Sequence, residues 1–380
     1  MEQKNKILRR AVLFTALGLA LAALAVALII CKANKIVLFY SDLGVPYGDY
    51  YSEEGQTSSR VSEDLAVFDG RLYVGGGDYD ANTGPIPVIS RNLGGGQWEL
   101  SEELLPDEQI KRFFVMDGKL VILGTDPTDD WSMGNYYALE GGAWVTHRDL
   151  PSGIHCFDAA KWGDETIFGL GVASGDLPAV RFDGESYSAI EFFKDGAPLD
   201  TSAHEIVRVY NLFEFKNVLY AFLTLDEKDE NGAPAGNFME LYAYKNGVFE
   251  FVSGKLPATD MPFVASDGER AYFIMNDTLL VTSDLMSFSA VSAGKSTRVS
   301  DIIKYDGEIF VLACRQSGES RFETMVFKVK DGSLHKEFGV FTSICAGAFT
   351  KDQSSFYISL GNRDSLSSPA HVGRVIKVTP

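Results

Sequence analysis

A strand–turn–strand pattern that returns roughly every 47 residues constrains the fold of this chain more than any other feature. Its turn positions lie 48, 47, 52, 51, 39 and 47 residues apart, a spacing typical of repeat architectures. Asp-Gly and Asn turns accept the positive φ that a two-residue hairpin requires, so each copy predicts two antiparallel strands. The seven copies are "VFDGRLYVGG" at Val67, "VMDGKLVILG" at Val115, "KWGDETIFGL" at Lys161, "FEFKNVLYAF" at Phe213, "ASDGERAYFI" at Ala265, "KYDGEIFVLA" at Lys304 and "TKDQSSFYIS" at Thr350.

A second hairpin signal follows in every unit but the last. It reads "LGGGQW" ending at Trp98, "EGGAW" at Trp144, "FDGESY" at Tyr187, "KNGVF" at Phe249, "DLMSF" at Phe288 and "KDGSL" at Leu334. Two hairpins make four strands, and four-stranded sheets repeated around an axis are the blades of a β-propeller. The sequence therefore predicts an all-β, seven-bladed β-propeller over residues 61–380.

Some of these repeats resemble known propeller motifs. The first unit has the doublet Gly75-Gly76, the second has Tyr137 seven residues before Trp144, and "LLP", "DLP" and "KLP" end outer strands. This order resembles kelch-type repeats. The turn "SRNLGGGQW" from Ser90 is similar to the Asp-box turns of sialidase-like propellers. Both resemblances imply the fold and neither implies an activity.

The last unit lacks an outer hairpin, because "RVIKVTP" is followed by nothing. An unpaired strand edge would leave the ring open. The β-prone segment "KIVLFYS", Lys35 to Ser41, is expected to supply the missing outer strand. The following stretch, Asp42 to Ser59, is expected to be a solvated surface loop, with a lid of its three tyrosines as the alternative. Residues 32–60 thus form a closing strand and loop.

An apolar run precedes the repeats. Ala11 to Cys31 contains 21 uncharged residues, enough for a helix to cross a bilayer core of about 30 Å. It exceeds the roughly 7 to 15 apolar residues of a cleaved signal peptide. Four basic residues precede it, so residues 1–10 are predicted to be a cytoplasmic tail, residues 11–31 a transmembrane signal anchor, and the propeller extracytoplasmic. Cleavage, or lipidation at Cys31, is the alternative, although a lipoprotein box needs a smaller residue than Ile30.

The charge and the cysteine content of the chain limit the kinds of partner and cofactor that it can bind. Beyond residue 35 the chain has 28 Lys and Arg against 51 Asp and Glu, a net charge of −23, which repels nucleic acid and anionic membrane surfaces. Cys156, Cys314 and Cys345 are an odd set without close spacing and are expected to be buried free thiols. No CxxC motif suggests zinc or redox chemistry, so no cofactor is expected.

No catalytic motif is present. The chain lacks G-x-S-x-G, a P-loop, H-E-x-x-H, the Arg-Ile-Pro motif of sialidases and the Tyr, His and Cys set of kelch-type copper oxidases. The leading hypothesis is a membrane-anchored binding or scaffolding module for a protein or an envelope glycan, without enzymatic activity. The alternatives are a glycosidase or lyase with its site at the channel mouth, which would need paired carboxylates, and a structural subunit of a membrane complex.

Two groups of residues are candidate ligand contacts. The loop "DDWSMGNYY" and the stretch after it carry Trp131, Asn135, His147, Arg148, His155 and Asp158. The innermost strands carry Arg60, Asp64, Arg112, Arg208, Arg298 and Asp301, which either bind an anionic ligand or pair with one another. A calcium-like spacing of Asp78, Asp80 and Asn82 has its glycine one place late and lacks the final Glu, so a turn is expected there and no metal.

Overall fold

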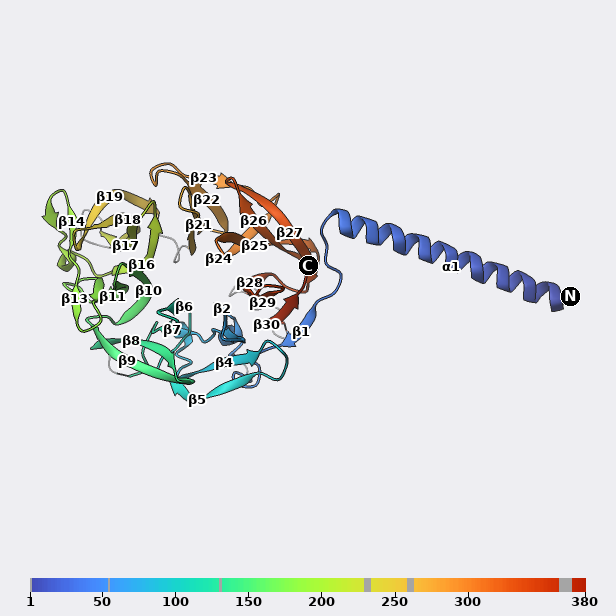
Figure 1. Cartoon of the computed structure of the whole chain (residues 1–380), viewed down its shortest axis with the longest axis horizontal. Helices are drawn as coiled ribbons and strands as arrows, with labels where there is room; N and C mark the ends of the chain where they lie inside the picture. Colours follow the sequence, from blue (N-terminus) through green and yellow to red (C-terminus); the bar gives the residue numbers. More distant parts are fainter. Residues whose placement is uncertain (1, 54, 130–131, 229–233, 258–262, 362–370) are drawn as a thin grey trace.

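A computed structural model describes residues 2–53, 55–129, 132–228, 234–257, 263–361 and 371–380. Its strands form a ring of sheets, a β-propeller fold, and the helix α1 (Glu2–Ala33) projects from the rim of the ring (Figure 1). The end of this helix is apolar and long enough to cross a membrane, as a signal sequence near an N-terminus also is. Five sheets have four strands and one has ten.

Four of the four-stranded sheets are consecutive antiparallel meanders. The first contains β2 (Leu65–Phe68), β3 (Arg71–Val74), β4 (Ile86–Asn92) and β5 (Glu99–Leu105). The second contains β6 (Phe113–Met116), β7 (Lys119–Leu123), β8 (Met133–Glu140) and β9 (Ala143–Pro151). The other two are β20 (Phe263–Ser266), β21 (Ala271–Met275), β22 (Thr278–Thr282) and β23 (Ser289–Val291), then β24 (Thr297–Tyr305), β25 (Glu308–Gly318), β26 (Arg321–Lys330) and β27 (Ser333–Thr342).

The ten-stranded sheet joins two further meanders. One is β10 (His155–Trp162), β11 (Glu165–Val172), β12 (Ala179–Phe182) and β13 (Tyr187–Ala189); the other is β16 (Val207–Phe215), β17 (Val218–Lys228), β18 (Pro234–Lys245) and β19 (Val248–Pro257). Two residue pairs between β11 and β16, Gly171 with Arg208 and Val172 with Val207, connect them. The hairpin of β14 (Phe192–Lys194) and β15 (Ala197–Pro198) adds to β19.

The hairpin turns have the backbone that the sequence predicts. Asp69 and Gly70 between β2 and β3 have φ values of 45° and 73°, and Asp117 and Gly118 between β6 and β7 have 48° and 75°. Two successive positive φ angles define the tight turn that matches the twist of paired strands. The Asp-Gly pairs therefore turn the chain.

A strand that follows α1 completes the last sheet. This sheet consists of β28 (Ala346–Lys351), β29 (Phe356–Leu360), β30 (Arg374–Val378) and β1 (Ser41–Gly44), which pairs antiparallel with β30. The expected strand at Lys35–Ser41 is thus wrong by several residues. Residues 35–37 instead lie parallel beside β27 and pair with it at one point. The Val37 amide donates to the Gly339 carbonyl at 2.8 Å, and the Gly339 amide donates to the Lys35 carbonyl at 2.8 Å.

The stretch after β1 is not a solvated loop, contrary to the expectation. Tyr47 is fully buried and Tyr51 is 2% exposed. The Tyr47 hydroxyl lies 3.2 Å from the Val74 carbonyl and 3.1 Å from the Pro87 carbonyl, so its one hydrogen is shared between these two acceptors inside the core. A Cβ atom on Gly76 would meet the Tyr47 ring at 2.6 Å. The glycine after β3 therefore makes room for this tyrosine.

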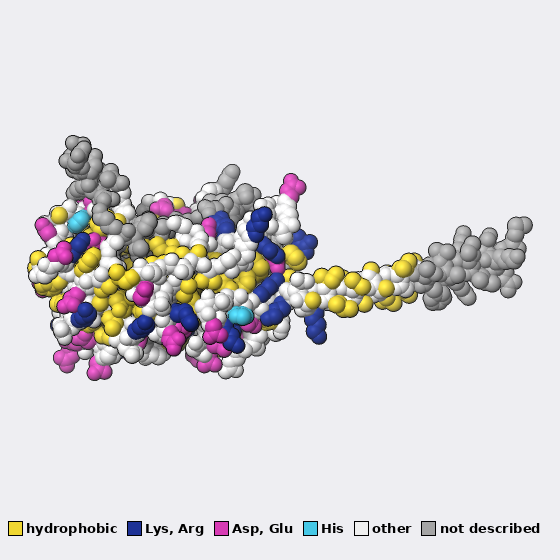
Figure 2. Space-filling model, turned by 90° about the horizontal axis from the view of Figure 1, so that it is seen from above, with side chains coloured by type: hydrophobic (Ala, Val, Ile, Leu, Met, Phe, Trp, Pro, Cys, Tyr) yellow, Lys and Arg dark blue, Asp and Glu magenta, His cyan; other side chains and the backbone are white. Residues whose placement is uncertain are grey.

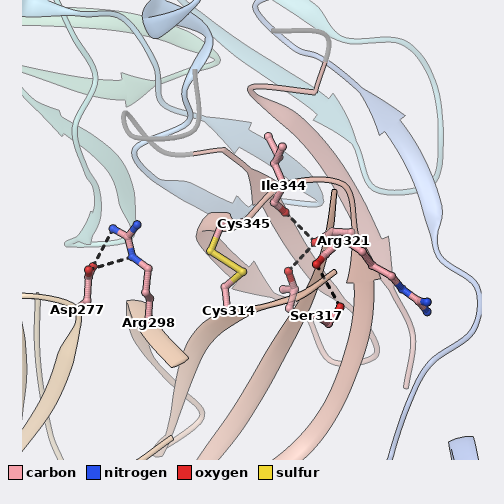
Figure 3. The surroundings of a disulfide bond; sticks show 9 residues. Asp277, Arg298, Cys314, Ser317, Arg321, Ile344 and Cys345 are labelled. Atoms are coloured by element: carbon pink, nitrogen blue, oxygen red, sulfur yellow. Dashed lines mark hydrogen bonds and ion pairs between the residues drawn. A yellow bond between two sulfur atoms is a disulfide. The ribbon is translucent and has the colours of Figure 1, made fainter. Parts of the chain in front are cut away.

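The prediction of three free thiols was also wrong. Cys314 in β25 and Cys345 just before β28 form a disulfide with a Cα–Cα distance of 5.7 Å, which links two neighbouring sheets (Figure 3). Cys156 is free and buried. The spacing of 31 residues hid the pair, because the two positions meet only when the sheets lie side by side.

Candidate functional site

Three aspartates, Asp158 and Asp301 on innermost strands and Asp64 just before β2, link their sheets to the next sheet of the ring. Each accepts two backbone N–H groups, one from the following residue and one from the innermost strand of the neighbouring sheet. Asp158, for example, accepts from Ala159 at 2.9 Å and from Leu212 at 2.8 Å. Asp64 reaches Phe113 and Asp301 reaches Phe349, both across a sheet boundary. We call Asp64, Asp158 and Asp301 the aspartate latches.

The charge of Arg112 acts on all three latches. Its guanidinium lies 3.6 Å from the Asp158 carboxylate. Burial raises the pKa of Asp158 to about 6 and, with the charge of Asp64 nearby, the pKa of Asp301 to about 7. Because both oxygens of each latch accept backbone N–H groups, these carboxylates serve inter-sheet structure. That they also contact a ligand stays a prediction.

A second group lies around the starts of innermost strands in the first four repeats. It is built from residues of the short helix Tyr79–Ala81, the segment before β6, the loop after β7, and strands β10 and β16. We call it the axial cluster, and its members are Tyr79, Lys111, Asp126, His155, Phe157, Arg208 and Tyr210.

Two β-bulges place the aromatic residues of the axial cluster. Register shifts fall between Cys156 and Asp158 in β10 and between Val209 and Asn211 in β16, so Phe157 and Tyr210 are the extra residues. A bulge re-aims a side chain that regular alternation would send to the other face. The two rings contact each other with centroids 4.7 Å apart.

The cations Arg208 and Lys111 lie against aromatic rings of the axial cluster. The Arg208 guanidinium lies 5.9 Å from the Phe157 centroid and donates to the Tyr210 hydroxyl at 2.8 Å. The Lys111 ammonium lies 4.4 Å from the Tyr79 centroid. Such contacts orient a cation while its charge still acts on its surroundings. The axial cluster therefore holds the positive charges of Lys111 and Arg208 beside aromatic rings.

His155 is neutral in this setting. Burial, with the positive charges of Arg208 and Lys111, lowers its pKa to about 4. Its Nδ1 lies 2.5 Å from the Thr125 carbonyl oxygen, which can only accept, so Nδ1 carries the proton. Burial raises the pKa of Asp126, whose carboxylate is 3.9 Å from the same nitrogen. His155 thus offers an unprotonated Nε2 atom.

The other candidates of the first group lie elsewhere. Asn135 is 1% exposed and donates to the Tyr137 hydroxyl at 3.1 Å, inside the core. His147 stacks on Tyr136 with ring centroids 4.4 Å apart, and Arg148 pairs with an aspartate at 2.5 Å, both on the outer strand β9. The stretch from Thr146 to Asp158 is therefore divided between the outside and the inside of the ring. Trp131 lies outside the described residues.

Arg60 and Arg298 also lie apart from the axial cluster. Arg60 donates to the Tyr51 carbonyl at 2.6 Å and holds the segment after β1. Arg298 pairs with Asp277 at 2.9 Å, with both side chains over 40% exposed (Figure 3). Of the predicted site residues, His155 and Arg208 belong to the axial cluster and Arg112 lies beside a latch.

The weak calcium candidates form a turn. Asp78 precedes the helix Tyr79–Ala81 and its side chain accepts from the Asp80 amide at 3.2 Å, while Asn82 ends the helix with a φ of 49°. In the part of the chain that the structure describes, no group of three His, Cys, Asp or Glu side chains is arranged to hold a metal ion.

Sequence reasoning missed Tyr79, Lys111, Asp126, Phe157 and Tyr210. Lys111 directly precedes Arg112, and Tyr210 follows Arg208 by two places, so both lay beside predicted positions. The signal was available for Lys111 alone, since it flanks an innermost strand. The bulges that bring Phe157 and Tyr210 to the axis leave no mark in an alternating pattern.

Comparisons with known proteins support the fold. No family model matches the chain, and no curated protein sequence matches it. The WD40 repeats of RRP9 align with a TM-score of 0.50 and 9% identity over 90% of this chain and 97% of that chain. An ulvan lyase of a polysaccharide lyase family aligns with a TM-score of 0.48 and 12% identity, over 83% and 91% of the two chains. A putative 6-phosphogluconolactonase from Bacteroides uniformis aligns with a TM-score of 0.46 and 15% identity, over 78% and 90%.

These likenesses define a class and no more. The chain is a β-propeller protein with one apolar N-terminal helix, and the alignment with the RRP9 repeats supports this fold.

Proposed function

We propose that this protein is a membrane-anchored, extracytoplasmic binding module whose axial cluster takes an acidic sugar of an envelope glycan. The observation that carries the proposal is the pairing of Lys111 and Arg208 with aromatic rings, at the axis of a domain whose net charge is −23 beyond residue 35. Aromatic faces suit sugar rings and cations suit carboxylates.

The ring is inferred to have seven blades. The ten-stranded sheet counts as two, because its meanders β10–β13 and β16–β19 share only the two residue pairs between β11 and β16. Five four-stranded sheets and these two meanders give the number that the repeat predicts. The kelch-type and Asp-box resemblances concern the glycine-rich turns of this ring and remain part of the proposal.

Binding is favoured over glycoside hydrolysis. A glycosidase needs two carboxyl groups on either side of the scissile bond. The latches Asp64, Asp158 and Asp301 are committed to backbone N–H groups, and Asp126 is the one carboxylate of the axial cluster. The described residues thus offer no such pair at the axis.

The membrane location rests on two further observations. Four basic residues precede the apolar helix, which favours a cytoplasmic N-terminus and an exported ring. The disulfide between Cys314 and Cys345 favours an oxidising compartment. Helix α1 is then a retained signal anchor.

The proposal can be tested with the purified full chain in detergent. Binding of polygalacturonate, a polymer of acidic sugars, is compared with binding of neutral dextran and of poly-glutamate by calorimetry. We expect polygalacturonate to bind, and Arg208→Gln to weaken it by about 10-fold to 100-fold, the value of one hydrogen bond to a charged group. Arg298→Gln is the matched control, since it removes an exposed arginine away from the axial cluster. Binding of poly-glutamate alone would favour a protein ligand, and equal binding by both variants would exclude the axial cluster.

A further inference from the structure

The charge of the ring changes along the chain. Residues 36–300 contain 42 Asp and Glu against 18 Lys and Arg, a net charge of −24. Residues 301–380 contain 9 Asp and Glu against 10 Lys and Arg, a net charge of +1. This second range covers nearly all of the sheet β24–β27 and strands β28, β29 and β30. We call it the neutral sector.

The N-terminal helix joins the ring at the neutral sector. Backbone hydrogen bonds tie Lys35 and Val37 to Gly339 of β27, and the Lys35 ammonium donates to the Lys336 carbonyl at 2.5 Å. A few residues later β1 pairs with β30. The linker is thus fixed to two sheets at once. Helix α1 leaves the rim close to the plane of the ring, and basic side chains gather at the junction (Figures 1 and 2).

Three apolar residues of this linker face solvent. Leu38, Phe39 and Tyr40 are 47%, 85% and 40% exposed, and Phe39 is the most exposed large hydrophobic residue in the part of the chain that the structure describes. They lie between the end of α1 at Ala33 and β1 at Ser41. Aromatic residues in this place, just beyond an apolar helix, suit the interface between lipid and water.

We propose that the ring stands on its edge against an anionic lipid surface, with Leu38, Phe39 and Tyr40 in the headgroup region and the neutral sector facing the lipid. The proposal rests on the membrane anchor of the proposed function. A body with a net charge of −23 would be repelled by anionic headgroups, but 42 of its 51 acidic residues precede residue 301 and so lie outside the neutral sector. Repulsion falls off within about a Debye length of 8 Å, so edge-on placement carries most of that charge out of range.

The test uses the full chain reconstituted in vesicles of phosphatidylcholine and phosphatidylglycerol. A fluorophore is attached to Phe39→Cys in a Cys31→Ala background, and lipids with a headgroup nitroxide serve as quenchers. The matched control is Val145→Cys, an exposed apolar position on β9, at the far side of the ring from the helix (Figure 1). We expect the label at position 39 to lose most of its emission and the label at position 145 to keep it.

Two results would overturn the proposal. Equal quenching at both positions would mean that the ring lies flat on the membrane, and no quenching at position 39 would mean that a protein or solvent covers the linker. Extraction with alkaline carbonate separates these results from a failure of the anchor. A chain released by carbonate has no transmembrane helix, whereas a retained chain with an unquenched label refutes only the edge-on placement.

Discussion

Replacing Asp158 by alanine tests whether the aspartate latches hold the ring together. The side chain is 3% exposed and accepts from the Ala159 and Leu212 amides at 2.9 and 2.8 Å. An unsatisfied buried N–H group costs about 1 to 3 kcal/mol, so two of them cost about 2 to 6 kcal/mol. Removing a desolvated carboxylate returns about 3 kcal/mol of this, because burial raises its pKa to about 6 from an ordinary value of 3.8. We expect a net loss of up to about 3 kcal/mol in the free energy of unfolding.

Urea unfolding of the full chain in detergent, followed by circular dichroism, measures this loss. Asp158→Asn keeps one acceptor oxygen and is expected to lose less than Asp158→Ala. The control Asp277→Ala removes an exposed partner of Arg298, and such surface pairs contribute at most about 1 kcal/mol. If Asp158→Ala costs no more than Asp277→Ala, the latch does not join the sheets and the reasoning is refuted.

Three further predictions concern stability. Cys314→Ser should lower the free energy of unfolding by about 3 to 4 kcal/mol through the loss of a 31-residue loop constraint, and peptide mass spectrometry without reductant should find the intact disulfide in the parent chain. Gly76→Ala should lower the melting temperature, because its Cβ would overlap the Tyr47 ring at 2.6 Å, whereas Gly318→Ala, with its nearest contact at 3.5 Å, should not. Burial raises the pKa of Asp301 to about 7, so the folded state binds this proton more tightly than the unfolded state does. The contribution of this group to stability therefore falls as the pH rises from 4 to 7. Asp301→Asn should flatten that part of a plot of melting temperature against pH, and an unchanged slope would contradict the assignment.

The repeat predicted the hairpins well because their chemistry is local. Asp69 and Gly70 turn the chain by their own backbone preferences, and the same holds for Asp117 and Gly118. The sequence predicted that a strand after the helix completes the last sheet, but placed that strand at Lys35–Ser41. The position was wrong because β-propensity does not say which strand edge is free for pairing. In the structure two edges are available, β27 and β30, and the segment uses both in succession.

The axial cluster could be predicted only in part. His155 and Arg208 were found because charges on innermost strands are visible in sequence. Asp158 lies on the same strand as His155, yet its carboxylate serves a sheet boundary, and sequence alone does not separate these two roles. The stretch from Thr146 to Asp158 looked like one site because its charges are close in sequence, but the chain crosses from an outer to an inner strand within it.

The latches and the axial cluster are parts of one arrangement. Asp158 follows His155 by three residues on β10, and its bond to the Leu212 amide reaches β16 four residues after Arg208. On β10 the bulge at Phe157 lies between His155 and Asp158, and on β16 the bulge at Tyr210 lies between Arg208 and Leu212. The latch therefore sets the distance between the strands that carry His155 and Arg208, and the bulges turn the rings towards each other. If this coupling holds, Asp158→Asn should weaken polygalacturonate binding although it touches no ligand, while Asp64→Asn, which joins the first and second sheets, should affect binding less.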